Sequence, residues 1–144
     1  MPNELTKVND QEQAAVLFGG EKLSAEYTSI PNDGTREAAA AIFNSFGDAE
    51  SLGDNVGQVI EVEHVSAHTV EIESEENGVV TAVRCILISP DGTRYAAVST
   101  GVMDSVKKLF AAVGLPPWTP PVKIAAKNVK TRKGFKTLRL ELKG

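Results

Sequence analysis

The sequence QVIEVEHVSAHTVEI at residues 58–72 is followed by VVTAVRCILI at 79–88 and TRYAAV at 93–98. In the first stretch apolar and polar residues largely alternate, which is the period of a strand, and we expect a bend near residues 66–67. The second stretch is β-branched and almost continuously apolar, which favours a strand buried on both faces over part of its length. SPDG at 89–92 predicts a tight turn, because proline fixes one φ angle and glycine supplies a positive one. Three consecutive strands are therefore expected, the last two joined as a hairpin.

A helix and two further strands follow. Apolar residues recur at three- and four-residue steps through 101–113, which predicts an amphipathic helix ending at Gly114. The segment LPPWTPP at 115–121 predicts a stiff connector, and VKIAAKNVKTRKGFKTLRLELKG at 122–144 predicts a β-hairpin. Three strands, one helix and two strands is the order of the OB-fold, a five-stranded Greek-key barrel. We therefore expect a mainly β protein with a five-stranded OB-fold barrel (β-β-β-α-β-β).

The segment before the barrel is less regular. Residues 35–46, TREAAAAIFNSF, contain strong helix formers after Thr35, a residue type that caps helix N-termini, although IFNSF could equally open a strand. Residues 1–34 mix polar residues, glycines and one short apolar run, so we expect a flexible N-terminal arm, poorly structured or partly helical. The arm could be disordered, add an edge strand or contact neighbouring molecules. The predicted organisation is an arm at 1–34 and an OB-fold domain at 35–144.

Composition indicates a soluble globular protein. The chain has 144 residues, of which 42% are hydrophobic and 24% charged, which suits one domain with its own core. It contains no apolar run near the roughly 20 residues that span a bilayer. The polar, acidic N-terminus does not look like a secretory signal, so we expect a cytoplasmic location. The single cysteine, Cys85, lies in the run VRCILI and is expected to be a buried thiol.

Residues for metal binding or catalysis are sparse. His64 and His68 are the only histidines, and four residues of extended strand span about 13 Å, too far for both to bind one metal ion. No local signature joins a serine or cysteine nucleophile to a histidine base, and the many glutamates have no defined partner. We therefore expect no metal, no cofactor and no enzymatic activity.

The charge distribution is the strongest functional signal. Residues 122–144 contain eight basic residues and one acidic residue, whereas the other 121 residues contain seven basic and eighteen acidic ones. An acidic protein that gathers its cations on one hairpin has a candidate surface for a polyanion. The candidate binding residues on this hairpin are Lys123, Lys127, Lys130, Arg132, Lys133, Phe135, Lys136 and Arg139.

The period of two assigns faces to this hairpin. Leu138, Leu140 and Leu142 share one face and are expected to point inward, as are Val122, Ile124 and Ala126 of the first strand. The opposite face then combines cations with one aromatic ring. Single-strand binding needs such a surface, because cations follow the phosphates and a ring stacks on a base. The alternative is a solvated face whose lysines keep an edge soluble, with the ring of Phe135 tucked under the turn.

Tyr95 and its neighbours form a second candidate. Tyr95 follows the Asp91-Gly92 turn on the third strand, and the second and third strands of an OB-fold form much of the ligand face. Tyr95 is therefore either a stacking platform, with Arg94 or Arg84 nearby, or a core tyrosine. Trp118 lies among prolines and is expected to plug one end of the barrel.

The order of these segments resembles the single-stranded DNA-binding proteins of tailed phages of Gram-positive bacteria, including small protein-primed Bacillus phages. The resemblance covers residues 36–143, and its most specific pieces are DGTRYAAVS and KTRKGFKTLRLEL. The resemblance implies an OB-fold protein that coats single-stranded DNA during phage replication, without catalysis. The tyrosine after the Asp-Gly turn corresponds to Tyr95 and the basic turn to residues 130–133. His68 stands where a relative has an aromatic residue, which weakens a stacking role there.

We therefore predict largely sequence-independent binding and protection of single-stranded DNA in phage DNA replication, in the cytoplasm of a bacterial host. The expected partners are single-stranded DNA and phage replication proteins, with no membrane association. The protein is expected to be a monomer or to self-associate weakly on DNA. The alternative function is an OB-fold protein–protein interaction module that docks a replication partner through Trp118 and the acidic strands.

Overall fold

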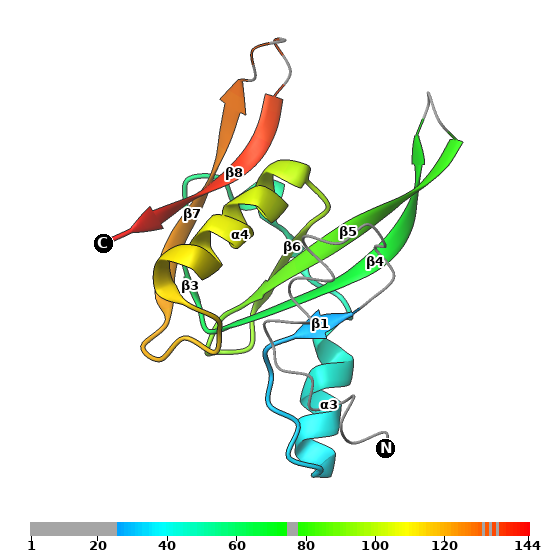
Figure 1. The fold of residues 1–144 in the computed structure, drawn as a ribbon, viewed down its shortest axis with the longest axis vertical. Coiled ribbons are helices and arrows are strands. Elements are labelled where there is room, and N and C mark those ends of the chain that lie inside the picture. The colour runs from blue at the N-terminus through cyan, green and yellow to red at the C-terminus, as the bar shows by residue number, and fades with distance from the viewer. Residues whose placement is uncertain (1–25, 75–77, 131, 133, 135) are drawn as a thin grey trace.

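A computed structural model describes residues 26–74, 78–130, 132, 134 and 136–144 (Figure 1). Strands and two helices alternate along the chain. Their order is β1 (Tyr27–Thr28), α3 (Arg36–Ser45), β2 (Glu50–Ser51), the 3-10 helix η1 (Leu52–Asn55), β3 (Val59–Val62), β4 (His64–Ser74), β5 (Gly78–Ile88), β6 (Arg94–Ala97), α4 (Thr100–Val113), β7 (Val122–Lys130) and β8 (Lys136–Lys143).

The strands form two sheets. One has five strands in the order β1-β4-β5-β6-β2, and the other has three in the order β3-β7-β8. All neighbours are antiparallel except β2 and β6, which run parallel. The expected order of three strands, one helix and two strands is present. Strands β3 and β4 together make the first predicted strand, and β5, β6, α4, β7 and β8 follow it. The short strands β1 and β2 are additions at the two edges of the larger sheet.

The predicted first strand passes from one sheet to the other. It breaks at Glu63, three residues before the expected bend, so that β3 pairs with β7 and β4 pairs with β5. Ile60 and Val62 point into the core, and the next buried residue is Val65, one position out of phase. This extra residue acts like a bulge, which bends a strand and re-aims its side chains. The Val62-to-Val65 spacing carries the signal in the sequence.

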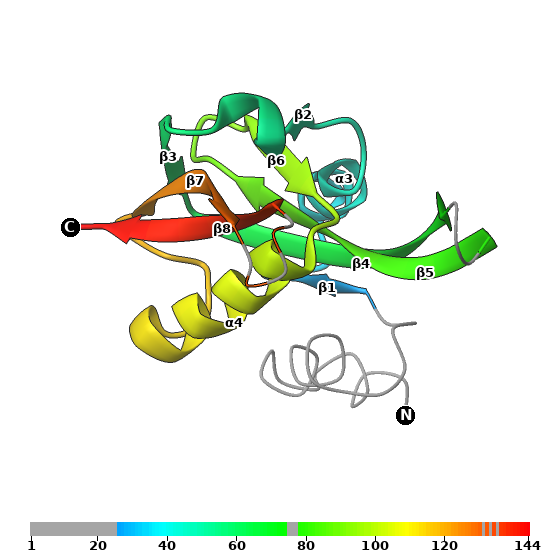
Figure 2. The same ribbon diagram turned by 90° about the horizontal axis from the view of Figure 1, so that it is seen from above.

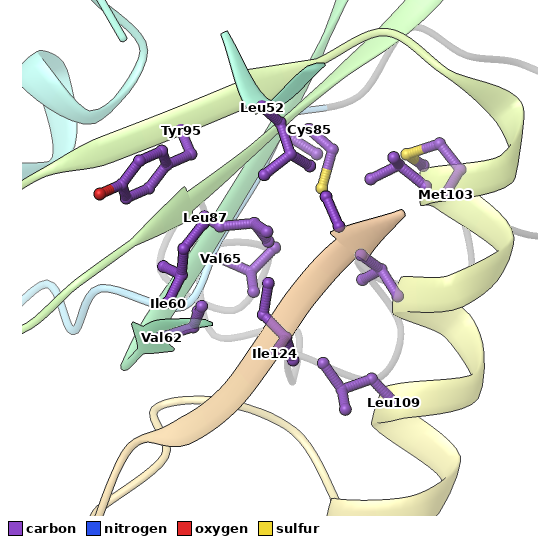
Figure 3. Close-up of a cluster of buried hydrophobic side chains, with 14 of the residues drawn as sticks. Leu52, Ile60, Val62, Val65, Cys85, Leu87, Tyr95, Met103, Leu109 and Ile124 are labelled. Carbon is purple, nitrogen blue, oxygen red and sulfur yellow. The ribbon is translucent and has the colours of Figure 1, made fainter. Parts of the chain in front are cut away.

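The core lies between the two sheets and α4 (Figure 3). Strands β3 to β7 and helix α4 all contribute to it, and Cys85 is among its members with 1% of its surface exposed, as the sequence predicts. Burial raises the pKa of this thiol to about 12. The side chains that α4 contributes are Val102, Met103, Val106 and Leu109.

Helix α4 lies along the free edge of β8 (Figures 1 and 2). Ser105 Oγ accepts a hydrogen bond from the backbone N–H of Leu140 at 3.0 Å. Ser99 Oγ donates to the carbonyl of Leu138 at 3.3 Å and also caps the helix. The helix therefore satisfies edge groups that a neighbouring strand would otherwise pair. Among the residues described, β6 and β8 belong to separate sheets, so the strands do not close into the expected barrel.

The N-terminal part of the described chain packs on the larger sheet. Thr35 caps α3 by accepting from the N–H of Ala38 at 3.1 Å, and the helix runs to Ser45, so IFNSF does not open a strand. Within the predicted arm, Tyr27 is fully buried and pairs with Ala67 of β4. Residues 27–28 thus add an edge strand, one of the roles left open for the arm, and residues 1–25 lie outside the described part.

Candidate nucleic-acid interface

The register of β7 and β8 places cations opposite one another. Lys123 faces Lys143, Lys127 faces Arg139, and Lys130 faces Lys136. Like charges directly opposite each other on neighbouring strands destabilise a sheet. The first pair is partly compensated, because Lys123 also lies opposite Glu61 of β3 and Lys143 pairs with Glu141. No carboxylate lies directly opposite a residue of the other two pairs within the described strands, so an anion placed there would relieve their repulsion.

The predicted faces of this hairpin agree with the structure near the core. Ile124 and Ala126 are fully buried, whereas Lys123 and Lys127 are exposed. Of the three leucines, Leu138 and Leu140 pack against the core, but Leu142 is 45% exposed although its cross-strand neighbour Ile124 is fully buried. Arg139, predicted to point outward, is only partly exposed.

The end of the hairpin is a solvated basic surface. Lys130, Arg132 and Lys136 are exposed there. Lys133 and Phe135 lie outside the described residues, so their predicted roles are not tested. The single acid of the hairpin, Glu141, binds Lys143 at 3.2 Å. The hydrogen bond and charge of Lys143, with the charge of Lys127, lower the pKa of this carboxyl group.

A second hairpin extends on the same side of the molecule. The far ends of β4 and β5, like those of β7 and β8, project beyond the core towards the top of Figure 1. The β4–β5 arm carries exposed Glu71 and Glu73. The two projecting hairpins therefore have opposite charge, and a polyanion is attracted to only one of them.

Arg84 and Arg94 hold the end of α3 against the larger sheet. Arg84 donates from Nη1 to the carbonyl of Phe46 at 3.1 Å and from Nη2 to that of Gly47 at 2.8 Å. Arg94 donates from Nε to the carbonyl of Asp48 at 2.9 Å. A cation is favourable at the carbonyl end of a helix. A phosphate would have to compete with these carbonyls for both guanidinium groups.

His68 belongs to the same cluster. Its Nε2 lies 3.2 Å from Arg84 Nη1, and its ring packs edge-on against Phe46 with a centroid distance of 5.1 Å. Burial and, to a smaller extent, the positive charge of Arg84 lower the pKa of this histidine. Both causes disfavour the protonated ring, which lies between an arginine and an aromatic side chain.

The two other aromatic candidates are core residues. Tyr95 is 8% exposed and its ring belongs to the buried cluster, so a base cannot stack on it in this conformation. This favours the core interpretation over the stacking platform. Trp118 is 5% exposed, donates from Nε1 to the carbonyl of Gly114 at 3.0 Å and packs edge-on against Phe110. A buried Trp118 offers no anchor for the alternative function of docking a protein partner.

Comparison with known proteins gives the family. A family model described as phage single-stranded DNA-binding protein matches residues 21–143. The chain belongs to this family. Its partner is therefore single-stranded DNA, in phage DNA replication, and the family is not enzymatic. No curated protein and no solved structure matches the chain.

Within the described ranges, no group of three or more histidine, cysteine, aspartate or glutamate residues could hold a metal ion. In the same part of the chain, no helix is long and apolar enough to cross a membrane.

Helix α4 carries cations that the sequence analysis did not consider. Lys107 and Lys108 are both exposed on it. The side of α4 that bears Ser105 lies against β8. Lys108 is three residues further along the helix and therefore lies on the same side.

Proposed function

We propose that this phage single-stranded DNA-binding protein coats DNA without base-sequence preference, and that the β7–β8 hairpin supplies the phosphate contacts. The three cation pairs across the hairpin carry this proposal. Phosphates that lie against such pairs replace a repulsion with an attraction and release counterions. Contacts to phosphate carry no sequence information, which accounts for binding without base preference.

The proposal assigns phosphate contacts to the hairpin cations and leaves stacking to Phe135, the remaining aromatic candidate. Arg84 and Arg94 would reach a phosphate only if the end of α3 moved. The site residues proposed on the hairpin are Lys123, Lys127, Lys130, Arg132, Lys133, Lys136 and Arg139.

We also infer an OB-fold whose barrel is left open at one seam. The element order, the bent first strand shared by both sheets and the pairing of β3 with β7 support it.

The proposed location is the host cytoplasm, where phage DNA replicates. A tailed phage of a Gram-positive host is the proposed source, and binding as a monomer or with weak self-association is the proposed state.

Salt titration of binding to fluorescent oligo-dT tests the proposal. Lys130→Ala with Lys136→Ala removes one cation pair, and Arg36→Ala with Lys107→Ala is a matched control with the same charge change. The hairpin variant should reduce the slope of log affinity against log salt by about 1.4, at about 0.7 per lost phosphate contact. Its stability should be unchanged or higher, because a repulsive pair is gone.

Base preference is tested with oligo-dT, oligo-dC and a mixed sequence of equal length, whose affinities should agree within a few-fold. Absence of binding to any of them at low salt would refute the proposal. Equal slopes for the hairpin variant and its control would also refute it, because the phosphate contacts would then lie elsewhere.

A further inference from the structure

We propose that a hollow between α4 and the β7–β8 hairpin binds one nucleotide unit of single-stranded DNA, with Lys108 as a phosphate-binding residue. This inference rests on the proposed function and extends it to a helix outside the hairpin. The hollow has a volume of about 310 Å³, at the lower end of the range for ligand sites, about 300–1,000 Å³. Its lining residues are Ser105, Lys108, Leu109, Ala112, Lys127, Arg139, Leu140 and Leu142.

The hollow exists because α4 meets β8 along only part of its length. At Ser105 the helix touches the strand through the 3.0 Å hydrogen bond to the N–H of Leu140. Further along, at Lys108 and Ala112, the helix and the hairpin line the hollow from opposite sides. The N-terminal half of α4 therefore fixes the width of the site.

Three cations from three elements surround the hollow. Lys108 comes from α4, Lys127 from β7 and Arg139 from β8, and no acidic residue is among the lining residues. The ion pairs found among the described residues involve none of the three. The acid whose pKa responds to Lys127, Glu141, is hydrogen-bonded to Lys143 instead.

Arg139 gives independent evidence for an anion. Its Nε is buried and has no hydrogen-bond acceptor within the described part of the chain. A buried donor on a charged group that lacks an acceptor costs free energy, and native proteins leave few such groups. A phosphate oxygen in the hollow is an acceptor of the right charge.

Half of the residues that line the hollow are apolar. They are Leu109, Ala112, Leu140 and Leu142, and Leu142 keeps 45% of its surface exposed. A ligand that suits both the cations and these apolar side chains combines a negative group with an apolar one. A nucleotide does so, because its phosphate can meet the cations while its sugar or base covers the leucines.

Continuity favours DNA over an acidic peptide. Lys127 and Arg139 form one of the cation pairs of the hairpin and also line the hollow. A strand bound at this pair therefore reaches Lys108 without leaving the basic surface.

Two matched pairs of variants of the full-length protein test the inference. Lys108→Ala is compared with Lys107→Ala, which removes the same charge from the same helix but lies outside the lining. Ala112→Glu, which places a carboxylate in the hollow, is compared with Ala111→Glu, on an exposed position outside it. The measurement is anisotropy of labelled oligo-dT over a series of salt concentrations, with circular dichroism to verify folding.

Lys108→Ala should lower the salt slope by about 0.7, the value for one phosphate contact, and Lys107→Ala should leave it unchanged. Ala112→Glu should weaken binding more than Ala111→Glu at low salt. Equal results within both pairs, with steep salt dependence retained, would overturn the inference and leave the proposed function intact. The inference would also be overturned, in favour of a peptide site, if Lys108→Ala bound DNA as wild type does but no longer captured oligo-glutamate that wild type captures. Loss of oligo-dT binding in wild type would instead refute the proposed function.

Discussion

Replacing Gly101 by alanine should destabilise the protein, although helix propensity alone predicts the opposite. Gly101 lies in the first turn of α4, and alanine is favoured over glycine inside a helix by about 1 kcal/mol. In the structure an added methyl group would press against the carbonyl oxygen of Leu138 and lie 2.6 Å from Oγ1 of Thr137. The backbone carbonyl of β8 cannot rotate away, so α4 has to move.

The expected cost follows from these contacts. Overpacking costs about 1–3 kcal/mol, and moving α4 weakens the hydrogen bonds from Ser99 Oγ to Leu138 and from Leu140 to Ser105 Oγ, each of which stabilises by about 1 kcal/mol. After the gain in propensity, the net loss is about 2 kcal/mol. This corresponds to a fall in melting temperature of roughly 6 °C for a domain of this size.

Thermal and urea unfolding followed by circular dichroism measure this loss. Ala111→Gly, at an exposed position of the same helix, calibrates the effect of propensity and should cost about 1 kcal/mol. A Gly101→Ala variant that is more stable than wild type would show that α4 does not approach β8 this closely. The hollow beside Lys108 would then lose the contact that sets its width.

Three further predictions concern single side chains. Burial is the main cause that lowers the pKa values of His64 and His68 below 6.5. The unfolded chain therefore takes up protons first as the pH falls, so stability should be constant above about pH 7.5 and decline towards pH 5, and glutamine at both positions should flatten this decline. Because the pKa of Cys85 is about 12, a thiol reagent at pH 8 should modify it only after unfolding by urea. Arg84→Ala should lower stability by about 1–3 kcal/mol and speed amide hydrogen exchange in residues 36–48, and lysine should restore little of this because one ammonium group cannot reproduce both hydrogen bonds.

Local patterns in the sequence determined the elements correctly where one interaction dominates. The SPDG turn forms as expected, with the N–H of Ser89 donating to the carbonyl of Thr93 at 2.9 Å. The alternation of leucines likewise predicted that Leu138 and Leu140 face the core. The bend at Glu63 was misplaced by three residues, although the Val62-to-Val65 spacing already contained the change of phase.

Contacts to the backbone were beyond sequence analysis. The sequence predicts Arg84 or Arg94 beside a nucleic-acid-binding Tyr95, yet the donors of both arginines meet the carbonyls at the end of α3. Every residue has a carbonyl group, so no side-chain pattern marks the one that will accept. The contact at the edge of β8 has the same origin, because Ser105 looks like an ordinary helix residue until its hydroxyl is seen against the backbone of Leu140.

The position of the cation pairs suggests why binding and local stability are linked in this protein. Lys130 and Lys136 face each other at the exposed end of the hairpin, beyond the buried residues Ile124 and Ala126. Repulsion at that end is not offset by apolar burial, so the free hairpin should open there first. A ligand that binds only the closed hairpin stabilises it by mass action. DNA should therefore protect the amides of Val129 and Thr137, the next pair along the ladder, from exchange much more than that of Ile124, whose strand the core already holds.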